Sequence, residues 1–205
     1  AVEVVKGLPT AITLASSDGA FAQEAAAMLH ADNLRVYSST DVIGVTVGGA
    51  LKNVIAIAAG ICDGMGFGCN ARAALITRGL AEITRFGLML GGAQETFMGL
   101  AGAGDLTLTC TGDLSRNHEV GLRLARGENL EDIIQYLGHV AEGVYTAREV
   151  LNRARMLGVE MPITHEVDQV LSAGLSPRRA VENLLKREQK SEAVSAYGAT
   201  ANQID

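Results

Sequence analysis

The first 45 residues alternate short apolar runs with one helical segment. The apolar runs at residues 10–15 and 34–38 predict strands, and residues 20–30, which follow Ser17 and Asp18, predict a helix between them. A sheet of only two strands is marginally stable on its own. We therefore interpret this strand-helix-strand unit as the edge of a larger sheet.

After this unit the apolar positions follow a helical pattern with almost no strand signal. Asn70 and Ser115 are candidate N-caps, and Pro177 suits a first helical position. Gly87 and Gly158 stand where a left-handed residue would end a helix. These signals predict a mainly α fold, with helices at residues 47–62, 70–86, 115–126, 130–135, 144–157, 163–173 and 176–186.

The longest apolar run, residues 43–61, has nearly the length of a membrane-spanning helix. Thr46, Lys52 and Asn53 interrupt it near its centre, and polar residues at that depth are costly in a bilayer. We therefore expect a buried helix and no membrane insertion.

Lys52 is the most informative residue of this run, because its neighbours are small or apolar. Desolvation lowers the pKa of an ammonium group toward the range in which the neutral amine can act as a base. Alternatively, Lys52 lies at the helix edge and extends its ammonium group to water. The segment alone leaves both interpretations open.

Composition narrows the classes of partner. The 205 residues are 48% hydrophobic and carry a net charge of −6 without a clustered basic face, which argues against nucleic acid as a partner. Cys62, Cys69 and Cys110 lack the C-x-x-C spacing of a zinc site or a disulfide framework. We expect three buried thiols, no metal and a cytoplasmic location.

Two glycine-rich places, residues 64–68 and 102–105, do not follow a predicted parallel strand, so neither meets the dinucleotide-binding fingerprint. Asp105 could be a plain helix N-cap. At residues 115–117, Ser-Arg-Asn offers a hydroxyl, a guanidinium, an amide and backbone N–H groups at a helix start, which suits a phosphate. An ordinary capped helix would use Ser115 alone.

Four motifs in combination resemble those of one family. They are G-G-A-L-K-N-V at 48–54, G-x-G-D-L-x-L-T-C-T at 102–111, S-R-N at 115–117 and V-A-E-G-V at 140–144. Their order and spacing resemble those of bacterial-type NAD(P)-dependent glycerol-3-phosphate dehydrogenase, from residue 1 to about residue 190. The opening A-V-E-V is similar to the end of a G-P-S-F-A-x-E-V segment of that family.

The resemblance implies a domain order. Residues 1–45 would be the C-terminal edge of a truncated Rossmann NAD(P)-binding domain. Residues 46–190 would form an all-helical substrate domain, similar to the C-terminal domain of 6-phosphogluconate dehydrogenase, and residues 191–205 a loose tail. Such a chain is expected to be nearly inactive alone, and its open strand edge is compatible with a homodimer.

The resemblance also implies the residues that act on the substrate. Lys52 would be the catalytic acid and base at the C2 oxygen, and Asp105 the carboxylate beside it. Ser115, Arg116 and Asn117 would hold glycerol 3-phosphate.

For the cofactor, NAD(P)H, the implied residues are Ala1, Arg116, Val140 and Glu142. His118 departs from the family, which often has another basic residue at this position. We expect His118 to tune phosphate binding without abolishing it.

The implied activity is the interconversion of sn-glycerol 3-phosphate and dihydroxyacetone phosphate, which supplies phospholipid synthesis. One alternative is a related two-domain dehydrogenase for another phosphorylated or carboxylated hydroxy compound, which the S-R-N match disfavours. Another is a helical interaction or dimerisation module without activity, in which Lys52 and Asp105 form only a structural pair.

Overall fold

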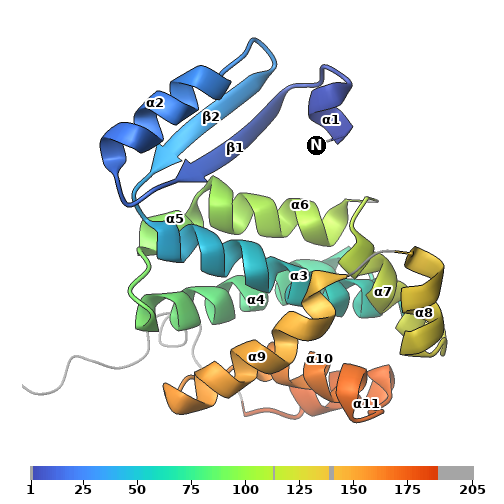
Figure 1. Ribbon diagram of the computed structural model, residues 1–205. Helices are drawn as coiled ribbons and strands as arrows, with labels where there is room; N and C mark the ends of the chain where they lie inside the picture. The colour runs from blue at the N-terminus through green and yellow to red at the C-terminus, as the bar shows by residue number, and fades with distance from the viewer. Residues whose placement is uncertain (1, 113, 139–140, 189–205) are drawn as a thin grey trace, which may run out of the picture.

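The computed structural model describes residues 2–112, 114–138 and 141–188. A small β-α-β unit lies above a larger body of helices (Figure 1). The mainly α fold and the N-terminal strand-helix-strand unit predicted from the sequence are both confirmed.

The β-α-β unit contains two parallel strands in register from Thr10 opposite Leu34 to Ala15 opposite Ser39. Asp18 caps the connecting helix, because its Oδ1 accepts hydrogen bonds from the backbone N–H groups of Ala20 and Phe21. The elements are α1 (Val2–Val5), β1 (Thr10–Ala15), α2 (Gly19–Leu29) and β2 (Leu34–Ser39).

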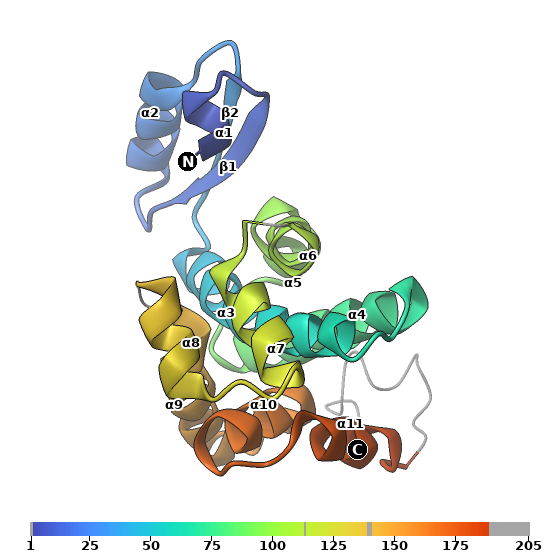
Figure 2. The same ribbon diagram turned by 90° about the vertical axis from the view of Figure 1, so that its right-hand side faces the viewer.

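The helical body is built around one long central helix, with the other helices packed around it (Figures 1 and 2). Its elements are α3 (Val42–Gly64), α4 (Cys69–Met89), α5 (Gln94–Met98), the π-helical turn η1 (Leu100–Gly104), α6 (Asp105–Thr111), α7 (Arg116–Ala125), α8 (Leu130–Leu137), α9 (Glu142–Met156), α10 (Pro162–Ser172) and α11 (Pro177–Leu185).

Helix α3 is the centre of the core. Leu51, Ile55 and Ile57 are fully buried. By length and composition alone α3 could cross a membrane, but 56% of its most apolar stretch is buried against the rest of the protein. The prediction of a buried core helix is therefore confirmed, although the helix begins at Val42 and not at residue 47.

Helices α3 and α7 touch backbone to backbone. A Cβ atom on Gly60 would overlap the carbonyl of His118, and one on Gly121 would overlap the carbonyl of Ile57. Only glycine permits so close an approach. This contact fixes the start of α7 relative to α3.

Several predicted boundaries are confirmed. Ser115 caps α7, Ser176 precedes Pro177 at the start of α11, and Gly158 is left-handed with φ of 67°. Two predictions are wrong. Asn70 lies inside α4, which begins at Cys69 after Gly68.

Gly87 also lies inside α4 and does not end it. It is a glycine because a Cβ atom there would overlap the ring of Phe97. The left-handed glycine after this helix is Gly91, with φ of 95°. Position 87 is therefore a glycine because Phe97 packs against it, and not because the helix ends there.

Candidate active site

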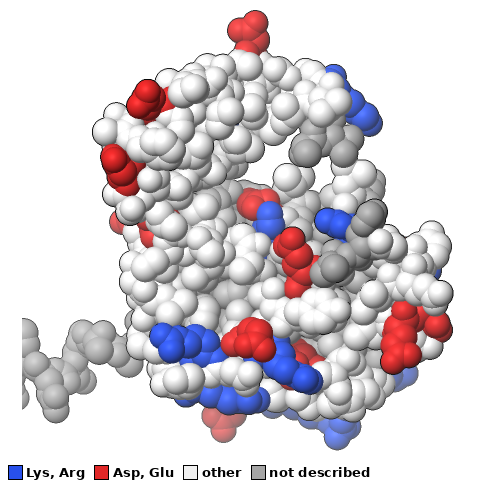
Figure 3. All heavy atoms as spheres, viewed as in Figure 1, with Lys and Arg blue, Asp and Glu red and all other residues white. Residues whose placement is uncertain are grey.

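A hollow separates the β-α-β unit from the helical body, and acidic and basic side chains gather along its lower side (Figure 3). Lys52 on α3 and Asp105 at the start of α6 form an ion pair, with Nζ 2.5 Å from Oδ2. The two side chains are 23% and 34% exposed. Lys52 is thus half-buried and paired, and it can still be reached from solvent.

The π-helical turn η1 places Asp105. Gly102 in this turn is buried, and a Cβ atom there would overlap the backbone of Phe97. Short π-helical segments are frequently found at functional sites. Helix α6 continues directly from this turn, so Asp105 is not a plain N-cap with a side-chain bond to the helix.

The start of α7 carries the Ser-Arg-Asn segment. The Oγ atom of Ser115 accepts a hydrogen bond from the backbone N–H of His118 at 3.2 Å, which leaves its hydroxyl proton for a ligand. Arg116 is exposed and pairs with no acidic residue in the described ranges. A hydroxyl, an exposed guanidinium and a helix N-terminus thus come within two consecutive residues, and each of these groups can bind a phosphate.

Asn117 has a structural bond as well. It is 8% exposed, and its Oδ1 accepts a hydrogen bond from the backbone N–H of Gly143 at 3.0 Å. Gly143 is close to both helices: a Cβ atom there would lie 2.7 Å from the carbonyl of Asn53 and 2.9 Å from Asn117 Oδ1. The start of α9 is thus held between α3 and α7.

Glu142 joins the same network. Asn53, the residue after Lys52, donates from Nδ2 to Glu142 Oε2 at 3.1 Å and to the carbonyl of Gly49 at 3.3 Å. Glu142 itself is exposed. The bonds of Asn53 and Asn117 to the start of α9 therefore link α3, α7 and α9 next to Lys52 in the chain.

His118 turns toward the end of α3. Its Nε2 lies 2.8 Å from Asp63 Oδ2, and Arg72 of α4 places Nη1 2.7 Å from the same oxygen. The imidazole is bound to this pair, so any effect of His118 on phosphate binding acts through the position of α7. That it tunes phosphate binding stays a prediction.

The buried thiols are not candidates for catalysis. Burial raises the pKa of the Cys110 thiol to about 12, and burial together with Asp63 raises that of Cys62. Cys69 is exposed, which corrects the prediction of three buried thiols. It is the first residue of α4, where the helix surface faces water. Within the described ranges, His, Cys, Asp and Glu side chains form no group able to hold a metal ion.

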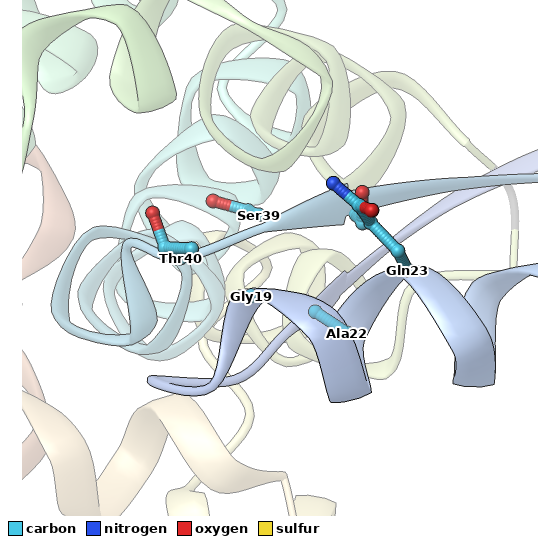
Figure 4. Close-up of a pocket in the computed structure, with 6 residues that line it drawn as sticks. Gly19, Ala22, Gln23, Ser39 and Thr40 are labelled. Atoms are coloured by element: carbon cyan, nitrogen blue, oxygen red, sulfur yellow. The ribbon is translucent and has the colours of Figure 1, made fainter.

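A separate pocket of about 320 Å³ lies between the start of α2 and the end of β2 (Figure 4). Its lining is uncharged, and none of the predicted site residues contributes to it. The lining residues are Gly19, Ala22, Gln23, Ser38, Ser39 and Thr40. The charged candidate site residues lie elsewhere, with Lys52 and Asp105.

Comparison with known proteins identifies the fold. A family model described as NAD-dependent glycerol-3-phosphate dehydrogenase C-terminus matches residues 41–182. The chain belongs to this dehydrogenase family. The resemblance inferred from the four motifs is thereby confirmed.

Relatives of the glycerol-3-phosphate dehydrogenase family match almost the whole chain. The glycerol-3-phosphate dehydrogenase (NAD(P)+) of Methylobacillus flagellatus is 74% identical over 95% of this chain, and that of Nitrosospira multiformis 69% identical over 94%. The crystal structure of the Coxiella burnetii enzyme has a TM-score of 0.87 and 46% identity over 90% of the chain. The chain spans 59%, 58% and 57% of these proteins' lengths, respectively.

Six of the predicted site residues lie in the described ranges. They are Lys52, Asp105, Ser115, Arg116, Asn117 and Glu142. The structure pairs Lys52 with Asp105, and it joins Asn117 and Glu142 to α3 through the start of α9. Ala1 and Val140 lie outside the described residues. Their assigned roles all stay predictions.

Sequence reasoning gave no role to Asn53, although it is buried and bonded to Glu142. The one available signal was its position inside an apolar run.

Proposed function

We propose that this chain carries the catalytic lysine and the substrate-phosphate site of an NAD(P)-dependent glycerol-3-phosphate dehydrogenase. The reaction interconverts sn-glycerol 3-phosphate and dihydroxyacetone phosphate. The observation that supports it best is the partly exposed Lys52–Asp105 pair, with Nζ 2.5 Å from Oδ2, on a helix that packs against α7, whose start carries Ser115 and Arg116. Membership of the family indicates which reaction the lysine and the phosphate site would serve.

Lys52 provides the proton. When dihydroxyacetone phosphate is reduced, negative charge develops on the C2 oxygen, and the Lys52 ammonium group stabilises that oxygen and then protonates it. In the reverse direction the neutral amine accepts the proton from the alcohol. Asp105 orients the ammonium group through their hydrogen bond.

The phosphate group of the substrate is remote from the reacting carbon and supplies binding energy. Arg116, the Ser115 hydroxyl and the backbone N–H groups at the start of α7 bind its oxygens. This contact holds the C2 carbonyl near Lys52. A substrate that is already oriented reacts faster, because the entropy cost of bringing the groups together is met on binding.

The residues present fit a nicotinamide cofactor. Glu142 is an exposed carboxylate held by Asn53, so it can accept hydrogen bonds from amide or hydroxyl groups, and the exposed Arg116 guanidinium can bind a phosphate. NAD(P)H would supply the hydride when bound. Ala1 and Val140 are further proposed contacts on the strength of the sequence motifs.

We place this activity in the cytoplasm, where its product would enter phospholipid synthesis. The location is proposed from the family and from cysteines that show no disulfide framework, and the role in phospholipid synthesis from the family alone. Association as a homodimer stays a prediction.

The test is turnover of the complete gene product that contains this chain. Reduction of dihydroxyacetone phosphate is followed by loss of NADH or NADPH absorbance. Lys52→Ala should lower kcat by several orders of magnitude at an unchanged melting temperature. Lys186→Ala, at an exposed lysine that follows α11, is the matched control.

The competing hypothesis is an interaction module in which Lys52 and Asp105 form only a structural pair. It predicts the opposite result: Lys52→Ala lowers the melting temperature, and no dihydroxyacetone phosphate is reduced by the unsubstituted protein. A carboxylate left partly buried without its partner lowers stability.

A further inference from the structure

The two neighbouring glycines at positions 48 and 49 differ in how closely other atoms approach them. A Cβ atom on Gly48 would lie 2.7 Å from the carbonyl oxygen of Ala101, in the η1 turn. A Cβ atom on Gly49 would meet nothing within 4 Å. Gly48 is buried and Gly49 is not. Only Gly48 therefore sits at a contact that a side chain would disturb.

The Gly48 contact lies one helical turn before the ion pair on both segments. Lys52 follows Gly48 by four residues on α3, and Asp105 follows Ala101 by four residues. Residues four apart lie on the same face of a helix. In Figures 1 and 2, α3 and α6 run beside one another in this region, and α3 contacts both η1 and α6.

We infer that Gly48 is a positioning residue for the proposed reaction: its missing side chain lets η1 approach α3 closely enough for Asp105 to hold the Lys52 ammonium group. The inference rests on the proposed function. Glycine weakens a helix interior, and a close backbone approach is one reason for a glycine there. The carbonyl of Ala101 supplies that requirement.

The size of the displacement follows from the geometry. Ordinary contact with a Cβ atom begins at 3.4 Å, so an alanine at position 48, whose Cβ atom would lie 2.7 Å from the carbonyl, falls about 0.7 Å short. The α3 backbone and η1 must separate by about this amount. Misplacing reacting groups by roughly 1 Å can lower a rate on the order of 100-fold.

The experiment compares Gly48→Ala with Gly49→Ala in the complete gene product, with dihydroxyacetone phosphate and NADH as substrates. Gly48→Ala should lower kcat by roughly 10- to 100-fold and leave the KM for dihydroxyacetone phosphate nearly unchanged, because α7 binds the phosphate. Gly49→Ala should keep kcat and melt slightly higher. Equal kcat values for the two variants would overturn the inference.

A double-mutant cycle separates positioning from general damage. If Gly48 acts through the ion pair, Gly48→Ala should lower kcat little further in an Asp105→Asn background. Equal fold-losses in both backgrounds would mean that Gly48 does not act through Asp105. A purely structural role would not produce this dependence on Asp105.

Two further outcomes are distinguishable. If the unsubstituted protein does not reduce dihydroxyacetone phosphate, the proposed function fails and the role of Gly48 with it. If it does, and the two alanine variants match, only the inference fails. Should Gly48→Ala melt too low to assay, the Gly48→Ala/Gly49→Ala protein restores helix stability through the uncrowded position 49 and is compared with Gly49→Ala alone.

Discussion

Glu82 gives the fold a calculable pH dependence. This carboxyl group lies on α4 and is only 2% exposed. It accepts hydrogen bonds from the backbone N–H groups of Ile163 and Thr164, at 2.6 and 3.3 Å, and from the Thr164 hydroxyl at 3.1 Å. The residue before α10 supplies no side-chain cap, so Glu82 satisfies this helix start from a neighbouring helix.

Burial raises the pKa of Glu82 from its ordinary 4.5 to about 7, against the opposing effect of these hydrogen bonds. The unfolded chain therefore loses this proton near pH 4.5 and the folded chain near pH 7. Between these values the folded state binds more protons, so the free energy of unfolding falls as pH rises. At about 1.4 kcal/mol for each pH unit, the loss is roughly 3 kcal/mol.

The assay is urea unfolding followed by circular dichroism between pH 4.5 and 8. Glu82→Gln has no proton to lose, so the unsubstituted chain should lose roughly 3 kcal/mol relative to this variant as pH rises to 7. Glu149→Gln, at an exposed position of α9, should keep the full pH dependence. Parallel curves for the unsubstituted chain and Glu82→Gln would refute the reasoning.

Two further predictions concern packing and thiol reactivity. Gly121→Ala should lower the free energy of unfolding by about 1–3 kcal/mol, because the new methyl group overlaps the α3 backbone; a melting curve unchanged from the unsubstituted chain would contradict the close contact. Among the cysteines, Cys69 alone should react with a disulfide reagent in the native chain, and Cys62 and Cys110 only in denaturant, since both are buried with raised pKa values. Rapid reaction of all three would show that the core opens freely.

The sequence predicted the elements whose stability is local. The two strands, the cap at Ser115, Pro177 at the start of its helix and the left-handed Gly158 all have signals in nearby residues, and they appear as expected. Helices α5 and α6 and the η1 turn were not predicted. Gly99, Gly102 and Gly104 weaken the helical pattern there, and the segment is helical because it packs closely on Phe97 and α3.

In the candidate site, too, the local features could be predicted and the contacts between distant segments could not. Lys52 attracts notice from its neighbours alone, but its partner Asp105 is 53 residues away, and no periodicity links the two. Only the resemblance to a family joined them before the structure did. The Asp63–His118 contact and the Asn53–Glu142 bond have no sequence signature, because each depends on how separate helices cross.

The glycine contact between α3 and α7 limits how this protein can diverge. Gly60 and Gly121 already bring the two backbones as near as peptide groups allow. Any substitution there adds atoms and can only widen the gap. Mutations elsewhere in the core can exchange one apolar side chain for another without altering this spacing. The distance from the helix that carries Lys52 to the helix start that carries Arg116 therefore changes little when other core residues are exchanged. If the proposed site is correct, a substrate of a different length would have to be accommodated by other parts of the protein.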